Sequence, residues 1–259
     1  MEKYSRLLTG SFIMAEGVGE KSEQQLWDAG FHHWRDVVDA KLPLSPQRSE
    51  SVKRSADDCL ERLSHNDLQW FYEILGPREQ FRLLPWFSDT TWCIDIETNG
   101  GFGPNDITII GMHHRYETHI LVKGRDMHSF PELFNGVGLM VTFFGTGFDI
   151  PFLKRAYPAL DFGKPHVDVC TLMRRIDMKG GLKAIEHRLG ISRDDDAVGL
   201  DGMDAVRLWN QWLYTRDMNA LDLLIKYNRE DIQNLPLLLD WAMPRLMTKI
   251  GADWLHQIE

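Results

Sequence analysis

The sequence predicts an α/β protein in which a mixed sheet is flanked by helices and preceded by a small helical domain. Three strand-like segments follow one another at 91–98, 107–114 and 117–122, and the pattern then alternates between strand and helix. Residues 1–86, by contrast, carry helical patterns without a convincing strand. A run of strands that gives way to alternating strands and helices is typical of a mixed sheet covered by helices.

The length and composition fit a globular protein with two unequal domains. A chain of 259 residues with 43% hydrophobic and 26% charged residues can bury a large core. Pro77 and Pro85 precede the first strand and mark the passage between the two patterns. We therefore expect a helical N-terminal region at 1–86 and an α/β domain at 87–259.

Several bulk features predict a cytoplasmic protein without a membrane partner. No apolar run approaches the ~20 residues that a membrane helix needs, and the N-terminus lacks the apolar core of a secretory signal. Cys59, Cys93 and Cys170 are far apart and odd in number, which indicates reduced thiols and no zinc site. The net charge of −9 disfavours non-specific binding of nucleic acid. It does not exclude a nuclease, because acidic metal ligands contribute to that charge.

The N-terminal region begins with a glycine-bounded turn. Gly17, Val18 and Gly19 precede an expected helix over 22–29, and Gly30 stands where that helix would end. This arrangement resembles a helix-hairpin-helix motif, whose turn presents backbone N–H groups to a phosphate. A plain tight turn between two packed helices remains the alternative.

Three further helical segments complete the N-terminal region. Apolar residues recur at helical spacing over 31–38. The segment 45–63 predicts a helix with a solvated basic face, and 67–75 predicts a packing helix.

The first strands predict an antiparallel meander. The segments 107–114 and 117–122 are separated by a turn near Arg115, and both follow the strand at 91–98. A short helix is expected over 129–134 and a buried strand over 138–144.

The strand at 91–98 carries two carboxylates on one face. Alternate side chains of a strand point the same way, so Asp95 and Glu97 lie side by side on one face. The apolar residues that alternate with them point to the other face. Two neighbouring carboxylates repel each other unless a cation lies between them. Chance alone gives about five such acid-x-acid triplets in a chain of this composition. A solvent-facing edge strand is therefore the alternative, and the carboxylates downstream decide between the two.

Two downstream segments add matching residues. Asp149 follows the buried strand at 138–144 and falls near a helix start, where the helix dipole favours an anion. Tyr227 and Asp231 are four residues apart and share one face of an expected helix. Taken singly, a capping Asp, a buried Tyr and a surface Asp explain these residues equally well.

As an ordered set, the motifs resemble the DEDD superfamily of 3′→5′ exonucleases in its tyrosine-bearing branch, which has an RNase-H-like fold. The amino-acid sequences at 148–153, 181–191 and 227–231 are similar to those of the YprB-like exonucleases, and the resemblance covers roughly 88–242.

The sequence departs from this family pattern at one position. Phe144 stands where many relatives carry Asn in the turn before the second motif, which affects how a substrate backbone is held but removes no metal ligand.

The resemblance implies a two-metal site. Asp95, Glu97, Asp149 and Asp231 would bind two Mg²⁺ or Mn²⁺ ions, hard cations that prefer oxygen ligands. By analogy, Asp95 would bridge the ions, Glu97 and Asp231 would complete the site for the ion that generates hydroxide, and Asp149 would support the second ion. Tyr227 would orient the attacking water, since an unperturbed pKa of ~10 makes it a poor base.

The implied function is a metal-dependent 3′→5′ exonuclease acting on single-stranded DNA or RNA ends. The segment 151–190 holds eight basic and four acidic residues and is the expected strand-binding edge. His166 and Asp168 are expected to make an ordinary polar contact and a helix cap. Two alternatives stay open: a non-catalytic nucleic-acid-binding or scaffolding protein with the same fold, and a structure-specific endonuclease.

Overall fold

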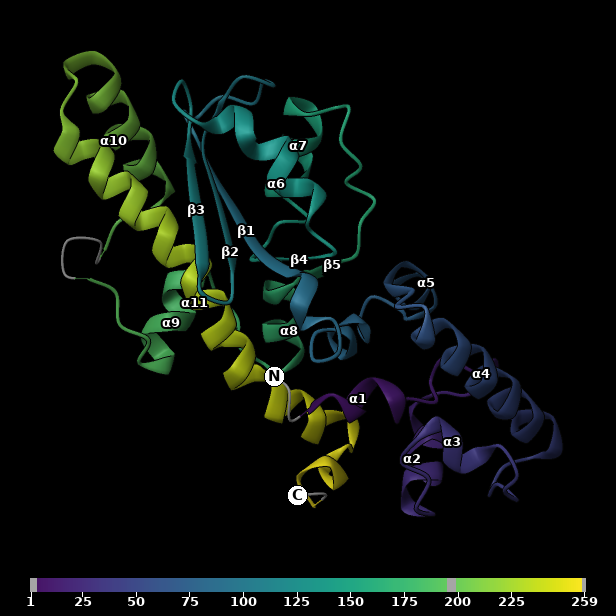
Figure 1. Cartoon of the computed structure of the whole chain (residues 1–259). Helices are drawn as coiled ribbons and strands as arrows, with labels where there is room; N and C mark the ends of the chain where they lie inside the picture. Colours follow the sequence, from purple (N-terminus) through teal and green to yellow (C-terminus); the bar gives the residue numbers. More distant parts are fainter. Residues whose placement is uncertain (1–3, 195–198, 258–259) are drawn as a thin grey trace. The chain divides into compact units, whose positions relative to one another are not determined.

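The computed structural model describes residues 4–194 and 199–257 (Figure 1). It divides into two compact units: one contains residues 1–89 and 243–259, and the other contains residues 90–242. The sequence predicts a boundary between residues 86 and 87 and a second domain that includes the C-terminal segment. In the structure, that segment belongs to the first unit.

The first unit is helical, and its described residues contain no strand. Its core includes a parallel stack of Trp34 on Phe71, with ring centroids 5.8 Å apart. The segment 31–38 forms one short helix, and the side chain of His33 caps the start of that helix. The helices of this unit that precede the sheet are α1 (Arg6–Thr9), α2 (Glu20–Asp28), α3 (Trp34–Val37), α4 (Pro46–Ser64) and α5 (Leu68–Ile74).

A buried ion network holds the turn that leads into α2. The guanidinium of Arg82 is fully buried and binds the carboxylate of Glu23 through two hydrogen bonds of 2.8 and 2.9 Å. Glu23 also accepts the backbone N–H groups of Phe12 and Ile13. These hydrogen bonds fix Phe12 and Ile13, which precede the turn, to α2 and to Arg82 within the first unit.

The second unit is built on one five-stranded sheet with the order β3-β2-β1-β4-β5. The first three strands pair antiparallel, as the sequence predicted, and β4 and β5 join the sheet in parallel. The strands are β1 (Thr91–Thr98), β2 (Ile107–His114), β3 (Glu117–Val122), β4 (Leu139–Thr142) and β5 (His166–Asp168). The predicted mixed α/β fold is confirmed, although the predicted strand over 138–144 is shorter and β5 was not anticipated.

Helices cover both faces of this sheet (Figure 1). Ile94 and Ile96 of β1 pack on one face with α6 and α7, whereas Ile109 of β2 packs on the other with α10 and α11. Asp95 and Glu97 therefore point to the α11 side. The helices are α6 (Phe130–Asn135), α7 (Asp149–Ala156), α8 (Val169–Arg175), α9 (Leu182–Leu189), α10 (Gly202–Thr215) and α11 (Met218–Ile250), the last of which continues into the first unit.

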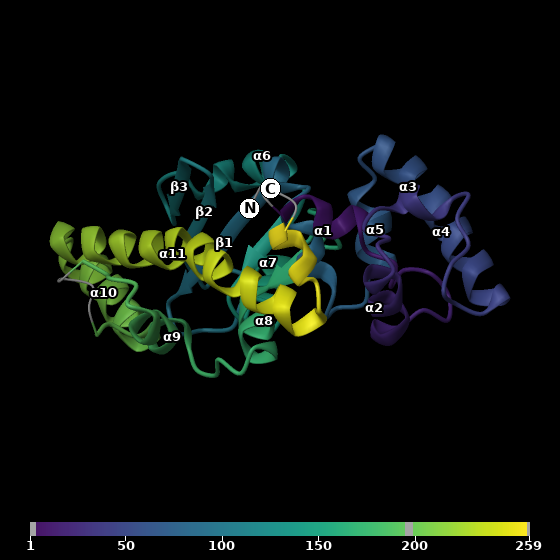
Figure 2. The same ribbon diagram turned by 90° about the horizontal axis from the view of Figure 1, so that it is seen from below.

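Figure 2 shows the length of α11, which passes along the sheet and carries the third sequence motif. Among the described residues, no helix is long and apolar enough to span a membrane. Asp195 and Asp196, which the sequence assigned with Asp194 to a solvated loop, lie outside the described residues.

Candidate metal centre

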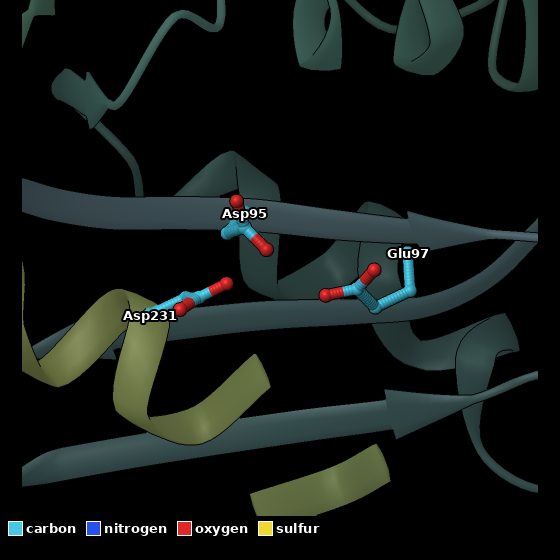
Figure 3. Close-up of side chains that lie close together, drawn as sticks. All are labelled: Asp95, Glu97 and Asp231. Carbon is cyan, nitrogen blue, oxygen red and sulfur yellow. The ribbon is translucent and has the colours of Figure 1, made fainter. Parts of the chain in front are cut away.

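Three of the predicted ligands meet at one point. Asp95 and Glu97 of β1 and Asp231 of α11 each offer a carboxylate oxygen, and these oxygens lie within 4.8 Å of one another. Figure 3 shows the three side chains directed toward one another from the strand and the helix. Because all three donors are carboxylate oxygens, the cluster suits a hard divalent cation.

Asp149 stands beside this group and not within it. It is the first residue of α7, it is 2% exposed, and its Oδ1 accepts the backbone N–H of Ile96 at 3.0 Å. Ile96 lies between the two acidic residues of β1, so this hydrogen bond fixes the second motif to the first. Burial raises the pKa of Asp149 to about 7.

The electrostatics of the cluster favour a bound cation. Burial, together with the neighbouring carboxylates, raises the pKa values of Asp95 and Glu97 well above their ordinary range. Burial also raises the pKa of Asp231, to about 6, against the opposing effect of nearby cations. A cation bound among these carboxylates would relieve their mutual repulsion.

Tyr227 lies one helical turn before Asp231 and contacts a lysine. The ammonium group of Lys183 in α9 donates a hydrogen bond to the hydroxyl oxygen of Tyr227. Burial and the nearby carboxylates raise the pKa of Tyr227 above its ordinary value. The phenol therefore stays protonated near neutral pH and can donate or accept a hydrogen bond but cannot serve as a base.

Arg193, which follows α9 in the chain, also binds the carboxylate of Asp231. Its Nη2 donates to Asp231 Oδ1, while its Nε and Nη2 form a two-bonded pair with Glu186 at 2.7 and 2.9 Å. Glu186 is 1% exposed and also accepts the amide N–H of Asn234. Arg193 therefore anchors Asp231 to a buried polar cluster between α9 and α11.

His166 and Asp168 have structural roles, as the sequence analysis expected. Asp168 accepts the backbone N–H of Cys170 and so caps α8, and it also accepts the N–H of Phe144 at 2.8 Å. His166 bonds the hydroxyl of Thr142. The Asp168 bond holds Phe144 at φ +63°, a left-handed conformation that is uncommon for an aromatic residue.

Sequence reasoning missed several residues of this centre. It treated Lys183 as one of the basic residues of the segment 151–190, a connector between the second and third motifs, and it assigned no role to Glu186, Arg193 or Asn228. Asn228 donates from Nδ2 to Asp95 Oδ2 at 2.8 Å. Its position directly after Tyr227 in the third motif was the only signal that could have drawn attention to it.

The mixed sheet, with an acidic cluster on its central strand, defines an RNase H-like protein. A family model described as the RNase_H superfamily matches residues 92–243. Because this match covers more than half of the chain, the chain belongs to the RNase_H superfamily. No curated protein matches the chain.

Among solved structures, the chain is similar to the family B DNA polymerase from the hyperthermophilic archaeon Pyrobaculum calidifontis. The two are 18% identical, with a TM-score of 0.48 and with 60% of this chain covered. The match covers 24% of the polymerase chain, so the matched part of this chain spans about a quarter of the length of that protein.

Proposed function

We propose that this protein is a metal-dependent nuclease that removes nucleotides from the 3′ ends of single-stranded nucleic acid. The observation that carries the proposal is the cluster of Asp95, Glu97 and Asp231, brought together from a strand and a distant helix. Membership of the RNase_H superfamily supports a nucleic-acid substrate. The order of the acidic motifs and the tyrosine supports the tyrosine-bearing, YprB-like branch of the DEDD exonucleases.

The four carboxylates Asp95, Glu97, Asp149 and Asp231 are the residues that would hold the ions. Two bound Mg²⁺ or Mn²⁺ ions would supply an activated water and stabilise the charge on the leaving oxygen. Asp149 also positions β1 through its hydrogen bond to Ile96. The hydroxyl of Tyr227 accepts a hydrogen bond from Lys183, so its own proton is available to a water or a phosphate oxygen.

The expected strand-binding edge stays part of this proposal, with its basic residues now divided by role. Lys164 donates to the backbone oxygens of Phe134 and Val137, and Lys183 enters the metal centre. Lys154 and Arg174 are exposed and are free to meet a phosphate backbone.

The helix-hairpin-helix assignment also stays a proposal. Gly17 adopts φ +76°, and α2 begins after Gly19 without a side-chain cap, so backbone N–H groups are open to a ligand. Against this, Glu20 lies in the first turn of α2 and would repel a phosphate. If the turn binds nucleic acid, Gly17→Val weakens binding of duplex oligonucleotides by the inactive Asp95→Ala protein.

The test of the function is a time course on 5′-labelled single-stranded DNA and RNA with Mg²⁺, Mn²⁺ or chelator. We expect a metal-dependent ladder that shortens from the 3′ end, which Asp95→Ala abolishes. Asp222→Ala, which removes an exposed carboxylate of α11, is the matched control and should retain activity. Internal cuts would establish the endonuclease instead. Binding without cleavage under any divalent ion would establish the scaffold.

A further inference from the structure

Asn228 is the one amide side chain within the described residues that contacts Asp95. It follows Tyr227 on α11 and is 0% exposed, so no substrate can reach it. Its Nδ2 donates to Asp95 Oδ2 at 2.8 Å. The amide of the third motif therefore holds the first acidic residue of β1 directly.

Gly111 makes this contact possible. It lies directly opposite Asp95 in the antiparallel pairing of β1 and β2, so a side chain there would point to the same face as Asp95. A Cβ at Gly111 would overlap the amide oxygen of Asn228 and approach Cδ1 of Ile232 to 3.0 Å. Because Gly111 has no side chain, the amide of Asn228 fits against its backbone.

The charge of the Asp95 carboxylate determines which way the amide of Asn228 faces. A carboxylate that holds a metal ion is ionised and only accepts hydrogen bonds, so the NH₂ group of Asn228 must point to Asp95. The amide oxygen is then buried against Gly111 and has no hydrogen-bond partner among the described residues. A buried polar atom without a partner is unfavourable. The hydrogen bond that Nδ2 donates to Asp95 is therefore the contact that offsets this cost.

We propose that Asn228 is a positioning residue that orients the carboxylate of Asp95 for a bound metal ion, in a space that Gly111 leaves open. This inference rests on the proposed metal-dependent activity. Hydrogen-bonded partners of metal ligands fix the orientation of those ligands, and their loss weakens metal binding by about 10- to 100-fold.

The test is calorimetric titration of Mn²⁺ into the full chain and three variants. Asn228→Leu keeps the number and branching of the side-chain heavy atoms and removes the donor, whereas Gly111→Ala leaves every polar group in place and displaces the amide. Both should weaken Mn²⁺ binding about 10- to 100-fold. Ile232→Val, which trims a side chain that packs at the same glycine, is the control and should bind as the wild type does.

A second readout separates positioning from general damage to the fold. Raising the Mn²⁺ concentration should restore the cleavage rate of Asn228→Leu, and the KM for the oligonucleotide should stay unchanged because Asn228 is buried. Wild-type Mn²⁺ affinity in folded Asn228→Leu would overturn the inference and leave the proposed function standing. If Asn228→Leu does not fold, Gly111→Ala decides by the same criterion. Absence of Mn²⁺ binding by the wild type would overturn the proposed function itself.

Discussion

Lys183 donates a hydrogen bond to the hydroxyl of Tyr227, so a cation from α9 contacts the aromatic residue of the third motif. The charge of the same ammonium opposes the rise in the pKa values of Asp95 and Glu97 that burial and the neighbouring carboxylates cause. Lys183 therefore combines two effects in one side chain: it orients the phenol and it offsets the repulsion among carboxylates.

Replacement of Lys183 by Met should lower kcat by about 10²-fold, as removal of one preorganised donor does in other active sites. Met retains the apolar stem and removes the ammonium. Lys179→Met, at an exposed lysine of the same connector, is the control. Single-turnover cleavage of a labelled oligonucleotide measures both, and an unchanged kcat in Lys183→Met would contradict the role given to this residue.

The metal-free protein should lose stability as the pH rises. The pKa of Asp149 is about 7 and that of Asp231 about 6 in the folded state, against an ordinary value of 3.8. Between these values the folded state binds more protons than the unfolded state, so the stability that these two carboxyls contribute is greatest below about pH 4 and falls as the pH rises through 7.

Thermal unfolding in chelator at pH 5 and pH 8 measures this effect, at ~2–4 °C in Tm for each kcal/mol. Asp149→Asn should flatten the pH dependence, and Mn²⁺ at pH 8 should restore the Tm. A Tm that is equal at both pH values would show that these carboxyls are not perturbed in the folded protein.

The ion pair of Arg193 and Glu186 should show strong coupling. Arg193→Leu leaves Glu186 buried without its cation, which we expect to cost about 3–5 kcal/mol in the free energy of unfolding. The double variant with Glu186→Leu removes both charges and should lose less than the sum of the single variants. Urea denaturation in chelator gives all three values. Additive losses would mean that the two side chains are not coupled.

Phe144 should tolerate Asn with a gain in stability. Its φ of +63° lies in the left-handed region, which Asn adopts more readily than an aromatic residue, and its side chain is 49% exposed. Phe144→Asn should therefore raise the free energy of unfolding by about 1 kcal/mol. Phe102→Asn makes the same change at another exposed phenylalanine and should give no gain. A loss of stability in Phe144→Asn would show that packing of the ring outweighs the strain.

The sequence predicted those parts of the molecule that depend on local pattern. The bounds of β1, β2 and β3 agree with the predicted segments, because each has a clear apolar pattern ended by a turn. Asp95, Glu97 and Asp231 could be predicted to meet only through the resemblance of the whole motif set. The three-residue strand β5 has too few residues for a periodic pattern, so no local signal marked it.

The supporting residues could not be predicted because their roles depend on tertiary contacts. Gly111 looks like a weak point in a strand until the register places it opposite Asp95. Arg193 lies next to a run of acidic residues and carries no motif of its own, yet its side chain is buried against Asp231 and Glu186. The sequence shows which residue types are present, but only the fold shows which of them touch.

The metal centre is tested most directly by a crystal structure of the protein with Mn²⁺, analysed by anomalous diffraction. We predict an anomalous peak bounded by the carboxylates of Asp95, Glu97 and Asp231, and its absence in Asp95→Asn. Crystals that hold Mn²⁺ elsewhere, with no peak among these three residues, would contradict the metal centre and the nuclease activity proposed from it.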